Sequence, residues 1–278
     1  MEIENVLLTR PERVSHLEDP LLDRLASMAA GRTVALVEVA GRDSVAASAY
    51  AARSGAFQLM VPTIAYTGTE HGDWTGSFEN AVIMMKMAEG TGTVVATEPV
   101  VLGSPRWWHA VAGRYSGLLQ SHYGFATTCV ACHMYLHAVR VPLAHRIGAT
   151  AIISGERLSH DRRTKLNQVS QTLGAYRSVL AGQGVDLYLP LESVSSWSEV
   201  LNTVGPLDDT DSGLSCVLEG NYREADGDVQ LDSPALSAYL VEFLVPFTEH
   251  VLRAFQAGGD LPDYLGTADE VIEGLVGP

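Results

Sequence analysis

The feature that most constrains the fold of this chain is a regular alternation of two kinds of segment. Short runs rich in β-branched and other apolar residues occur at residues 33–39, 57–66, 93–96, 150–153 and 185–189. Such runs are typical of strands buried on both faces of a sheet. Segments of helical length occur at residues 44–53, 74–89, 107–121, 132–147 and 163–180. This alternation predicts an α/β fold: a five-stranded, mainly parallel sheet with helices on both faces.

The same pattern suggests three regions along the chain. We expect residues 1–30 to form a helical or irregular N-terminal segment, residues 31–205 the α/β domain, and residues 206–278 a C-terminal extension. Near its start the extension is acidic and contains glycine, which is typical of loop or hairpin structure. Residues 233–257 then form a long helical pattern, which we expect Pro246 to interrupt.

Composition restricts the partners of the protein. The chain has 18 basic and 33 acidic residues, a net charge of -15, which opposes long-range attraction to nucleic acids and anionic membranes. Residues 1–30 contain no apolar segment of the signal-peptide type, and no run approaches the roughly 18 apolar residues of a membrane-spanning helix. We therefore expect a cytoplasmic protein with no membrane partner.

The loop after the first predicted strand has the composition of an anion site. Ala40, Gly41, Arg42, Asp43 and Ser44 lead from that strand into a helix of small residues. Ligands of such sheets bind beyond the carboxyl ends of the strands, where the first N–H groups of the helix can hold phosphate oxygens. The carboxylate at position 43 could hold Mg²⁺ or cap the helix. The residues alone favour phosphate binding and simple helix initiation about equally.

The cysteines pose the sharpest question in the sequence. Cys129, Cys132 and His133 form a Cys-x-x-Cys-His motif, and Cys216 is the only other cysteine. Covalent haem attachment is typical of exported proteins, and three cysteines cannot make a paired disulfide framework. A zinc site that also uses His133 or His137, a reactive dithiol and an iron-sulfur cluster remain open.

A basic segment follows the predicted strand at residues 150–153. Gly155 and Glu156 come first, and four cations follow within nine positions: Arg157, Arg162, Arg163 and Lys165. Cations at the carboxyl edge of the sheet would complement phosphate or carboxylate groups, and they oppose the dipole of a following helix. We therefore prefer a ligand-binding role to a solvated helix start.

The loop at residues 39–44 resembles the second half of the Ser-Gly-Gly-x-Asp-Ser loop of the PP-loop ATP pyrophosphatase superfamily, whose members are adenine nucleotide α-hydrolase-like. Val39 and Ala40 stand where that family has its first serine and glycine. The resemblance implies a five-stranded parallel sheet and a loop that grips the pyrophosphate of ATP while a carbonyl oxygen is adenylated. It implies nucleotide contacts from residues 40–44, Thr67 and Gly155.

The cysteine order resembles that of the iron-sulfur-dependent thiouridine synthases of this superfamily. Those enzymes have a Cys-x-x-Cys after the third strand and one cysteine roughly ninety residues later, and the three ligate a 4Fe-4S cluster. The resemblance implies that Cys129, Cys132 and Cys216 ligate such a cluster and leave one iron open. We expect Asp43 to hold Mg²⁺, Arg162 and Lys165 to stabilise charge during catalysis, and Glu156 to act beside the substrate.

These observations predict an ATP-dependent, iron-sulfur sulfurtransferase acting on a small molecule or a nucleobase-type carbonyl. Its sulfur would come from sulfide or a sulfur-carrier protein, and a homodimer is open as its assembly. A desulfidase that needs no ATP, a tRNA 2-thiolation enzyme, and a non-catalytic zinc- or nucleotide-binding module are the alternatives. The acidic charge makes tRNA the less favoured substrate.

Overall fold

A computed structural model describes residues 12–13, 19–161, 163–207, 213–224, 227, 229, 232–258 and 261–276. The strands are β1 (Val34–Glu38), β2 (Leu59–Tyr66), β3 (Glu70–Gly72), β4 (Val95–Ala96), β5 (Val100–Gly103), β6 (Ala151–Ile153), β7 (Asp186–Tyr188) and β8 (Leu214–Cys216). The first helices are α2 (Asp19–Ala29), α3 (Arg42–Ser54), α4 (Thr75–Glu89), α5 (Pro105–Trp108), α6 (Ser116–Tyr123), α7 (Thr128–Ala138) and α8 (Val141–Ile147). The later helices are α9 (Ser170–Gly182), α10 (Trp197–Val204), α11 (Ser233–Tyr239), α12 (Val245–Ala257) and α13 (Tyr264–Val276).

The main sheet confirms the predicted α/β class. Its order is β4-β2-β1-β6-β7, every pairing in it is parallel, and β5 pairs with the end of β2. The predicted number of five strands is wrong, because the sheet has six. The start of β2 pairs with β4 and its end with β5, so the two short strands follow each other along one edge. The strand that was not predicted is β5, which begins shortly after β4 ends.

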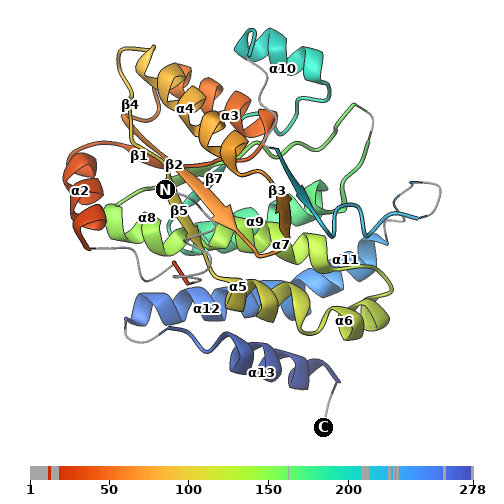
Figure 1. Cartoon of the computed structure of the whole chain (residues 1–278). Helices are drawn as coiled ribbons and strands as arrows, with labels where there is room; N and C mark the ends of the chain where they lie inside the picture. The colour runs from red at the N-terminus through yellow and green to blue at the C-terminus, as the bar shows by residue number, and fades with distance from the viewer. Residues whose placement is uncertain are drawn as a thin grey trace.

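Helices cover both faces of the sheet (Figure 1). Alternate residues of β1 face opposite ways, as in any strand: Val34 and Leu36 belong to one core cluster, and Ala35 and Val37 to the other. The second cluster is closed by α3, α4 and α10, while the first packs against α2, α7, α8 and α9. The sheet is therefore buried on both sides, which explains why its strands read as continuous apolar runs.

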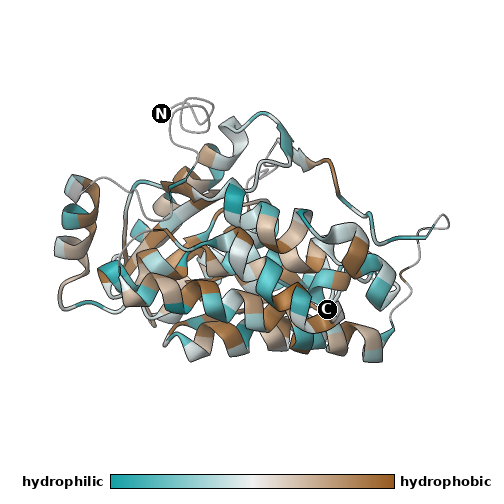
Figure 2. Cartoon of the chain, turned by 90° about the horizontal axis from the view of Figure 1, so that it is seen from below, coloured by the Kyte–Doolittle hydropathy of each residue, from teal (hydrophilic) through white to brown (hydrophobic). Residues whose placement is uncertain are grey.

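The C-terminal helices extend the first core cluster. Residues of α11, α12 and α13 belong to the same cluster as β1, and α12 contacts α7, α8 and α9. Figure 2 shows this layer from below, with both hydrophilic and hydrophobic residues on its helices. The extension predicted at residues 206–278 thus completes the core of the α/β domain.

Three helix predictions need correction. The segment 132–147 forms two helices, and Pro142 lies in the first turn of the second. The segment 107–121 contains a π-helical stretch, His109–Gly113, before α6. The predicted helix 163–180 begins only at Ser170, after a short 3-10 turn at Leu166–Gln168.

Pro246 does not interrupt the last long helix as predicted. It lies in the first turn of α12, directly after a π-helical stretch at Leu240–Leu244 that connects α11 to α12. A π-turn accommodates a proline by rearranging the hydrogen bonds around it. Among the described residues, the helical run Ser233–Ala257 is long and apolar enough to cross a membrane by length and composition alone. Half of its apolar window is buried in the protein, and core helices pass the same test, so the evidence for a membrane span is weak.

Candidate functional site

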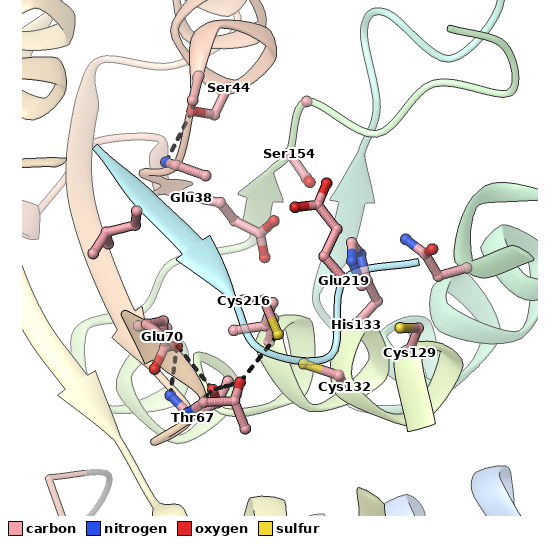
Figure 3. A pocket seen from close by; sticks show the side chains of 18 of the residues that line it. Glu38, Ser44, Thr67, Glu70, Cys129, Cys132, His133, Ser154, Cys216 and Glu219 are labelled. Atoms are coloured by element: carbon pink, nitrogen blue, oxygen red, sulfur yellow. Dashed lines mark hydrogen bonds between the residues drawn. The ribbon is translucent and has the colours of Figure 1, made fainter. Parts of the chain in front are cut away.

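A cavity of about 560 Å³ lies at the carboxyl edge of the sheet. The loops that follow β1, β2 and β6 line it, together with α7 and the segment around β8 (Figure 3). Every predicted site residue that the structure describes lines this cavity: Ala40, Gly41, Arg42, Asp43, Ser44, Thr67, Cys129, Cys132, Gly155, Glu156, Lys165 and Cys216. Arg162 lies outside the described residues. The predicted sites therefore share one space, of a size typical for small ligands.

The loop after β1 presents the start of α3 to this cavity. Gly41 is the N-cap residue, and no side chain caps the first turn. The Ser44 hydroxyl folds back onto the loop: it donates to the Gly41 carbonyl at 2.7 Å and accepts from the Ala40 N–H at 3.0 Å. An uncapped helix start that faces a cavity is suited to an anion.

Asp43 is held by a buried arginine of the protein itself. Its carboxylate lies 3.2 Å from Nε of Arg157 and 3.7 Å from Nδ1 of His160. Arg157 is 1% exposed, so its charge requires this partner. The arrangement makes Asp43 a fixed element of the loop and leaves its charge largely compensated, which argues against Mg²⁺ binding as its main role. The sequence placed Arg157 in a ligand-binding basic cluster, whereas in the structure its guanidinium is buried against Asp43.

Gly155 allows the loops after β1 and β6 to pack closely against each other. A Cβ atom at this position would lie 2.4 Å from the carbonyl carbon of Asp43 and 2.5 Å from the amide nitrogen of Ser44. β1 and β6 are neighbours in the sheet, so the loops after them meet at its edge. Glycine is therefore required for close packing of the loops, a role that the sequence did not distinguish from ligand contact.

Hydrogen bonds to one carboxylate, that of Glu70, hold the loop after β2 in its conformation. Glu70 accepts hydrogen bonds from the N–H and the hydroxyl of Thr67, both at 2.8 Å, and from the N–H of Gly68 at 3.0 Å. Figure 3 shows these bonds beside Cys216. The position of Thr67 in the cavity agrees with the prediction, while its polar groups serve the turn.

The pairing of β3 with β8 brings Cys216 into the site. These two strands form a small antiparallel sheet in which Glu70 lies opposite Cys216. The sulfur of Cys216 lies 3.3 Å from the Thr69 hydroxyl and accepts the N–H of Leu218 at 3.4 Å. A segment far away in the sequence is thereby fixed beside Cys132 (Figure 3).

Gly72 is the position where this pairing can be tested. Its φ is +115°, and a Cβ there would lie 2.2 Å from the Gly213 carbonyl oxygen. The test uses a variant that keeps Cys216 but has serine at positions 129 and 132. In this background we expect Gly72→Ala to raise the alkylation rate of Cys216 by at least about tenfold, because backbone strain of about 1–3 kcal/mol at residue 72 would separate the two strands. Gly117→Ala, where the added Cβ meets open space, is the control and should leave the rate unchanged. An unchanged rate for Gly72→Ala would contradict this account of how Cys216 is held.

Two of the three cysteines, Cys129 and Cys132, lie in surroundings that disfavour thiolates. Burial, assisted by the neighbouring Cys216 and Glu219, raises the pKa of Cys129 to about 12. Burial also raises the pKa of Cys132 strongly, assisted by Cys129 and Cys216. The Cys129 thiol donates to Asn221 Oδ1 at 3.1 Å. Without a cation these thiols stay protonated, and ligation of a metal would be needed to ionise them.

The spacing of the sulfurs bears on which metal they fit. Among the described residues, the three cysteines do not form a set whose ligand atoms lie within 4.8 Å of one another. Three thiolates on one zinc ion would be about 3.7 Å apart, given Zn–S bonds near 2.3 Å. The three-thiolate zinc site that the sequence left open is therefore not preformed. A cubane cluster places its thiolates on separate irons, which requires a wider arrangement.

A network of buried charged residues lies between the loop after β1 and the cysteines. Glu38, the last residue of β1, accepts from His137 Nδ1 at 2.8 Å and lies 3.2 Å from Arg140. Burial alone would raise the pKa of Glu38, but His137 and Arg140 outweigh burial and lower it from 4.5 to about 2. Glu156 lies 2.6 Å from Nδ1 of His133, which lowers its pKa against the effect of burial.

Sequence reasoning missed Glu38 and Arg140 in this network. The signal for Glu38 was present: it is an ionisable residue in a strand that is otherwise apolar, and it is 9% exposed. A buried charge must be paired, so such a residue predicts a cationic partner. The identity of that partner could not be read from the sequence, because Arg140 is far from Glu38 along the chain, between α7 and α8.

A comparison with known proteins identifies a related sequence. No protein-family profile matches the chain. The chain is 33% identical over 224 residues to the uncharacterized protein MJ0009 of Methanocaldococcus jannaschii, and the match covers 80% of each of the two chains. Identity at this level, over most of both sequences, reflects a common fold and descent. The chain therefore belongs to the same family as this archaeal protein.

Proposed function

We propose that the protein is an iron-sulfur-dependent, cytoplasmic sulfur-transfer enzyme that replaces a carbonyl oxygen of a small molecule or nucleobase, with ATP as the activating substrate. The observation that carries this proposal is that Cys129, Cys132 and the distant Cys216 line one cavity with the loops after β1 and β6. The resemblance to the PP-loop thiouridine synthases accounts for both halves of this arrangement.

The cysteines fit a 4Fe-4S cluster better than a single ion. They offer three thiols in one cavity, spaced more widely than a mononuclear site requires, and burial keeps Cys129 and Cys132 protonated until a cation binds. When bound, such a cluster would supply an iron without a protein ligand, which can accept sulfur as a Lewis acid. The Thr69 hydroxyl beside Cys216 would donate a hydrogen bond to the ligating sulfur and so tune it.

The opposite end of the cavity would hold the nucleotide. The uncapped start of α3 and its Gly41 allow the backbone to approach phosphate oxygens closely. Lys165 lines the cavity and can neutralise charge that develops on the α-phosphate. Asp43, held by Arg157, would keep the loop in its binding conformation.

The reaction balances without any further co-reactant. The carbonyl oxygen of the substrate attacks the α-phosphorus of ATP, the bond to pyrophosphate breaks, and pyrophosphate leaves. Sulfide then attacks the activated carbon, and AMP leaves with the original oxygen. Glu156 and His133, 2.6 Å apart on the cavity wall, can accept the proton that sulfide releases.

Anaerobic metal analysis tests the cluster. Protein purified or reconstituted without oxygen should contain close to four iron and four acid-labile sulfide per chain, since three thiolates and one open iron define a complete cubane. Cys132→Ser and Cys216→Ser should each lose most of this iron. Ser215→Ala, a neighbour that also lines the cavity, is the matched control and should keep it. Stoichiometric zinc and no iron would overturn the proposal in favour of a zinc-binding module.

Calorimetry with a non-hydrolysable ATP analogue tests the nucleotide step. We expect binding by the unchanged protein, and weaker binding by Lys165→Ala, because a cation facing the phosphates is removed. No binding by the iron-loaded protein would remove adenylation and leave the second candidate, a desulfidase that takes sulfur from a thiocarbonyl without ATP. That candidate is favoured by Val39 and Ala40, which offer no hydroxyl at the start of the loop, and by the compensated charge of Asp43.

Thiolation of tRNA is less favoured. The basic cluster that would bind the phosphate backbone is divided, because Arg157 is buried against Asp43 while Arg163 is exposed. Binding of tRNA that weakens steeply with salt would contradict this preference.

A further inference from the structure

Three residues outside the cysteine set converge in the wall of the same cavity. His133 and His137 lie one turn apart on α7, and Glu156 follows β6. Their ligand atoms all lie within 4.8 Å of one another. His133 Nδ1 is 2.6 Å and His137 Nε2 is 3.7 Å from Glu156 Oε1. Around a tetrahedral ion with ligand bonds near 2.0–2.1 Å, neighbouring ligand atoms are about 3.3 Å apart, so small side-chain shifts would complete a site.

Two buried atoms of this group have no hydrogen-bond partner among the described residues. They are Nε2 of His137 and Oε2 of Glu156, on side chains that are 1% and 6% exposed. The 3.7 Å separation of Nε2 from Glu156 Oε1 is too long for a hydrogen bond. A buried polar atom without a partner costs free energy, so both atoms indicate a ligand that the protein is built to receive.

The neighbours of His137 have the arrangement that metal-binding histidines use. Nδ1 of its ring is held at 2.8 Å by Glu38, which orients the ring and leaves Nε2 facing Glu156. A carboxylate behind the histidine is the usual support of a metal-ligating imidazole. Glu38 and Glu156 place two negative charges here against the one positive charge of Arg140, so a further cation at this group would be compensated.

We infer that His133, His137 and Glu156 bind a divalent transition-metal cation, separate from the cysteine site and with an open coordination position toward the cavity. Two imidazoles and one carboxylate suit Zn²⁺ or a similar borderline cation, while Mg²⁺ and Ca²⁺ prefer oxygen ligands throughout. Three protein ligands with a fourth position open to a cavity are typical of catalytic rather than structural sites. All three residues line the cavity, so a water or substrate oxygen could occupy that position.

The experiment removes the cysteines, so that it depends on neither the cluster nor the proposed function. In the three-serine variant (Cys129→Ser, Cys132→Ser, Cys216→Ser), the metal-free protein is titrated with Co²⁺ under visible spectroscopy. We expect one Co²⁺ per chain, with ligand-field absorption and no thiolate charge-transfer band. Zn²⁺ should displace the Co²⁺ and raise the Tm, because it binds the folded state, whereas Mg²⁺ should do neither.

Substitutions in that background assign the ligands. His137→Ala and Glu156→Gln should abolish Co²⁺ binding, and Glu38→Gln should weaken it about 10–100-fold by releasing the ring of His137. If either of the first two variants fails to fold, His133→Ala gives the same test. The side chain of His133 is 29% exposed, so its removal does not leave a fully buried void. His250→Ala, at an exposed histidine on α12, is the control and should bind as the parent does.

Two outcomes would overturn the inference. One is that the folded three-serine variant binds no Co²⁺ or Zn²⁺, which would mean that a proton on an imidazole compensates the buried charge instead. The other is that binding persists unchanged in both His133→Ala and Glu156→Gln. Loss of iron from the single cysteine variants is a separate result, so failure of the cluster proposal can be told apart from failure of this one.

Discussion

Glu38→Gln is expected to lower the free energy of unfolding by about 3–5 kcal/mol, the usual cost of removing one partner from a buried ion pair. Glu38 is the carboxylate that both His137 and Arg140 contact, and Arg140 is 2% exposed. With glutamine in its place, the guanidinium keeps its desolvation cost but loses its closest counter-charge. Urea denaturation of the metal-free protein at pH 7 measures the difference.

A surface pair provides the matched control for this substitution. Glu98 lies 3.8 Å from Arg24, and both side chains are mostly exposed. Exposed pairs contribute about 0–1 kcal/mol, so Glu98→Gln should change the unfolding free energy little. If the two variants lose similar stability, the buried network has no special part in holding the fold.

The pH dependence of the Glu38 effect follows from the direction of its pKa shift. The folded pKa is about 2, below the ordinary value of 4.5, so the unfolded chain binds the proton more readily. The contribution of Glu38 is therefore fully present above about pH 4.5 and is lost as the pH falls toward 2. The stability difference between the unchanged protein and Glu38→Gln should shrink as the pH falls below 4.5. A difference that stays constant from pH 6 to pH 3 would contradict the low pKa.

Gly155→Ala is expected to have the largest effect on ligand binding. Its Cβ would lie 2.4–2.6 Å from backbone atoms of Asp43 and Ser44, and backbone cannot move aside as a flexible side chain can. We expect a loss of stability of about 1–3 kcal/mol from overpacking, and at least a tenfold weaker affinity for the ATP analogue, because the loop after β1 is displaced. Urea denaturation and calorimetry measure the two effects separately.

A second glycine of the chain provides the matched control for Gly155→Ala. Gly174 lies within α9, and a Cβ there meets nothing within 4 Å. Gly174→Ala should raise stability by up to about 1 kcal/mol, since alanine is the better helix former, and should leave nucleotide affinity unchanged. Tight nucleotide binding by a stable Gly155→Ala protein would show that the nucleotide does not rest on this loop.

The cavity combines groups that rarely share one space without a functional reason. An uncapped helix start, three partly buried thiols and a histidine–carboxylate group all face it. Perturbed ionisable groups in a cavity are a recognised indication of an active site. In the proposed sulfur transfer each part would have a use: the helix start for the nucleotide, the thiols for the sulfur-binding centre, and the histidine–carboxylate group for proton or metal chemistry.

Most of the sheet was readable from the sequence. Residues 33–39, 57–66, 93–96, 150–153 and 185–189 each contain a strand of the structure, because strands buried on both faces must be apolar along their whole length. The strands that were missed, β3 and β5, lie outside the predicted runs and form by pairing with β8 and with the end of β2. In such short segments pairing with a partner, rather than local pattern, decides the conformation.

The sequence by itself also determined which residues would meet at the edge of the sheet. Loops that follow parallel strands share that edge, so the sequence alone predicts that Asp43, Thr67 and Glu156 lie together. The tertiary structure alone decided how they are used. Asp43 pairs with Arg157, Glu38 joins Arg140 and His137, and β8 carries Cys216 to the other cysteines. These contacts join segments that are distant along the chain, and the choice among partners rests on packing and charge compensation in the folded core, which a local pattern does not encode.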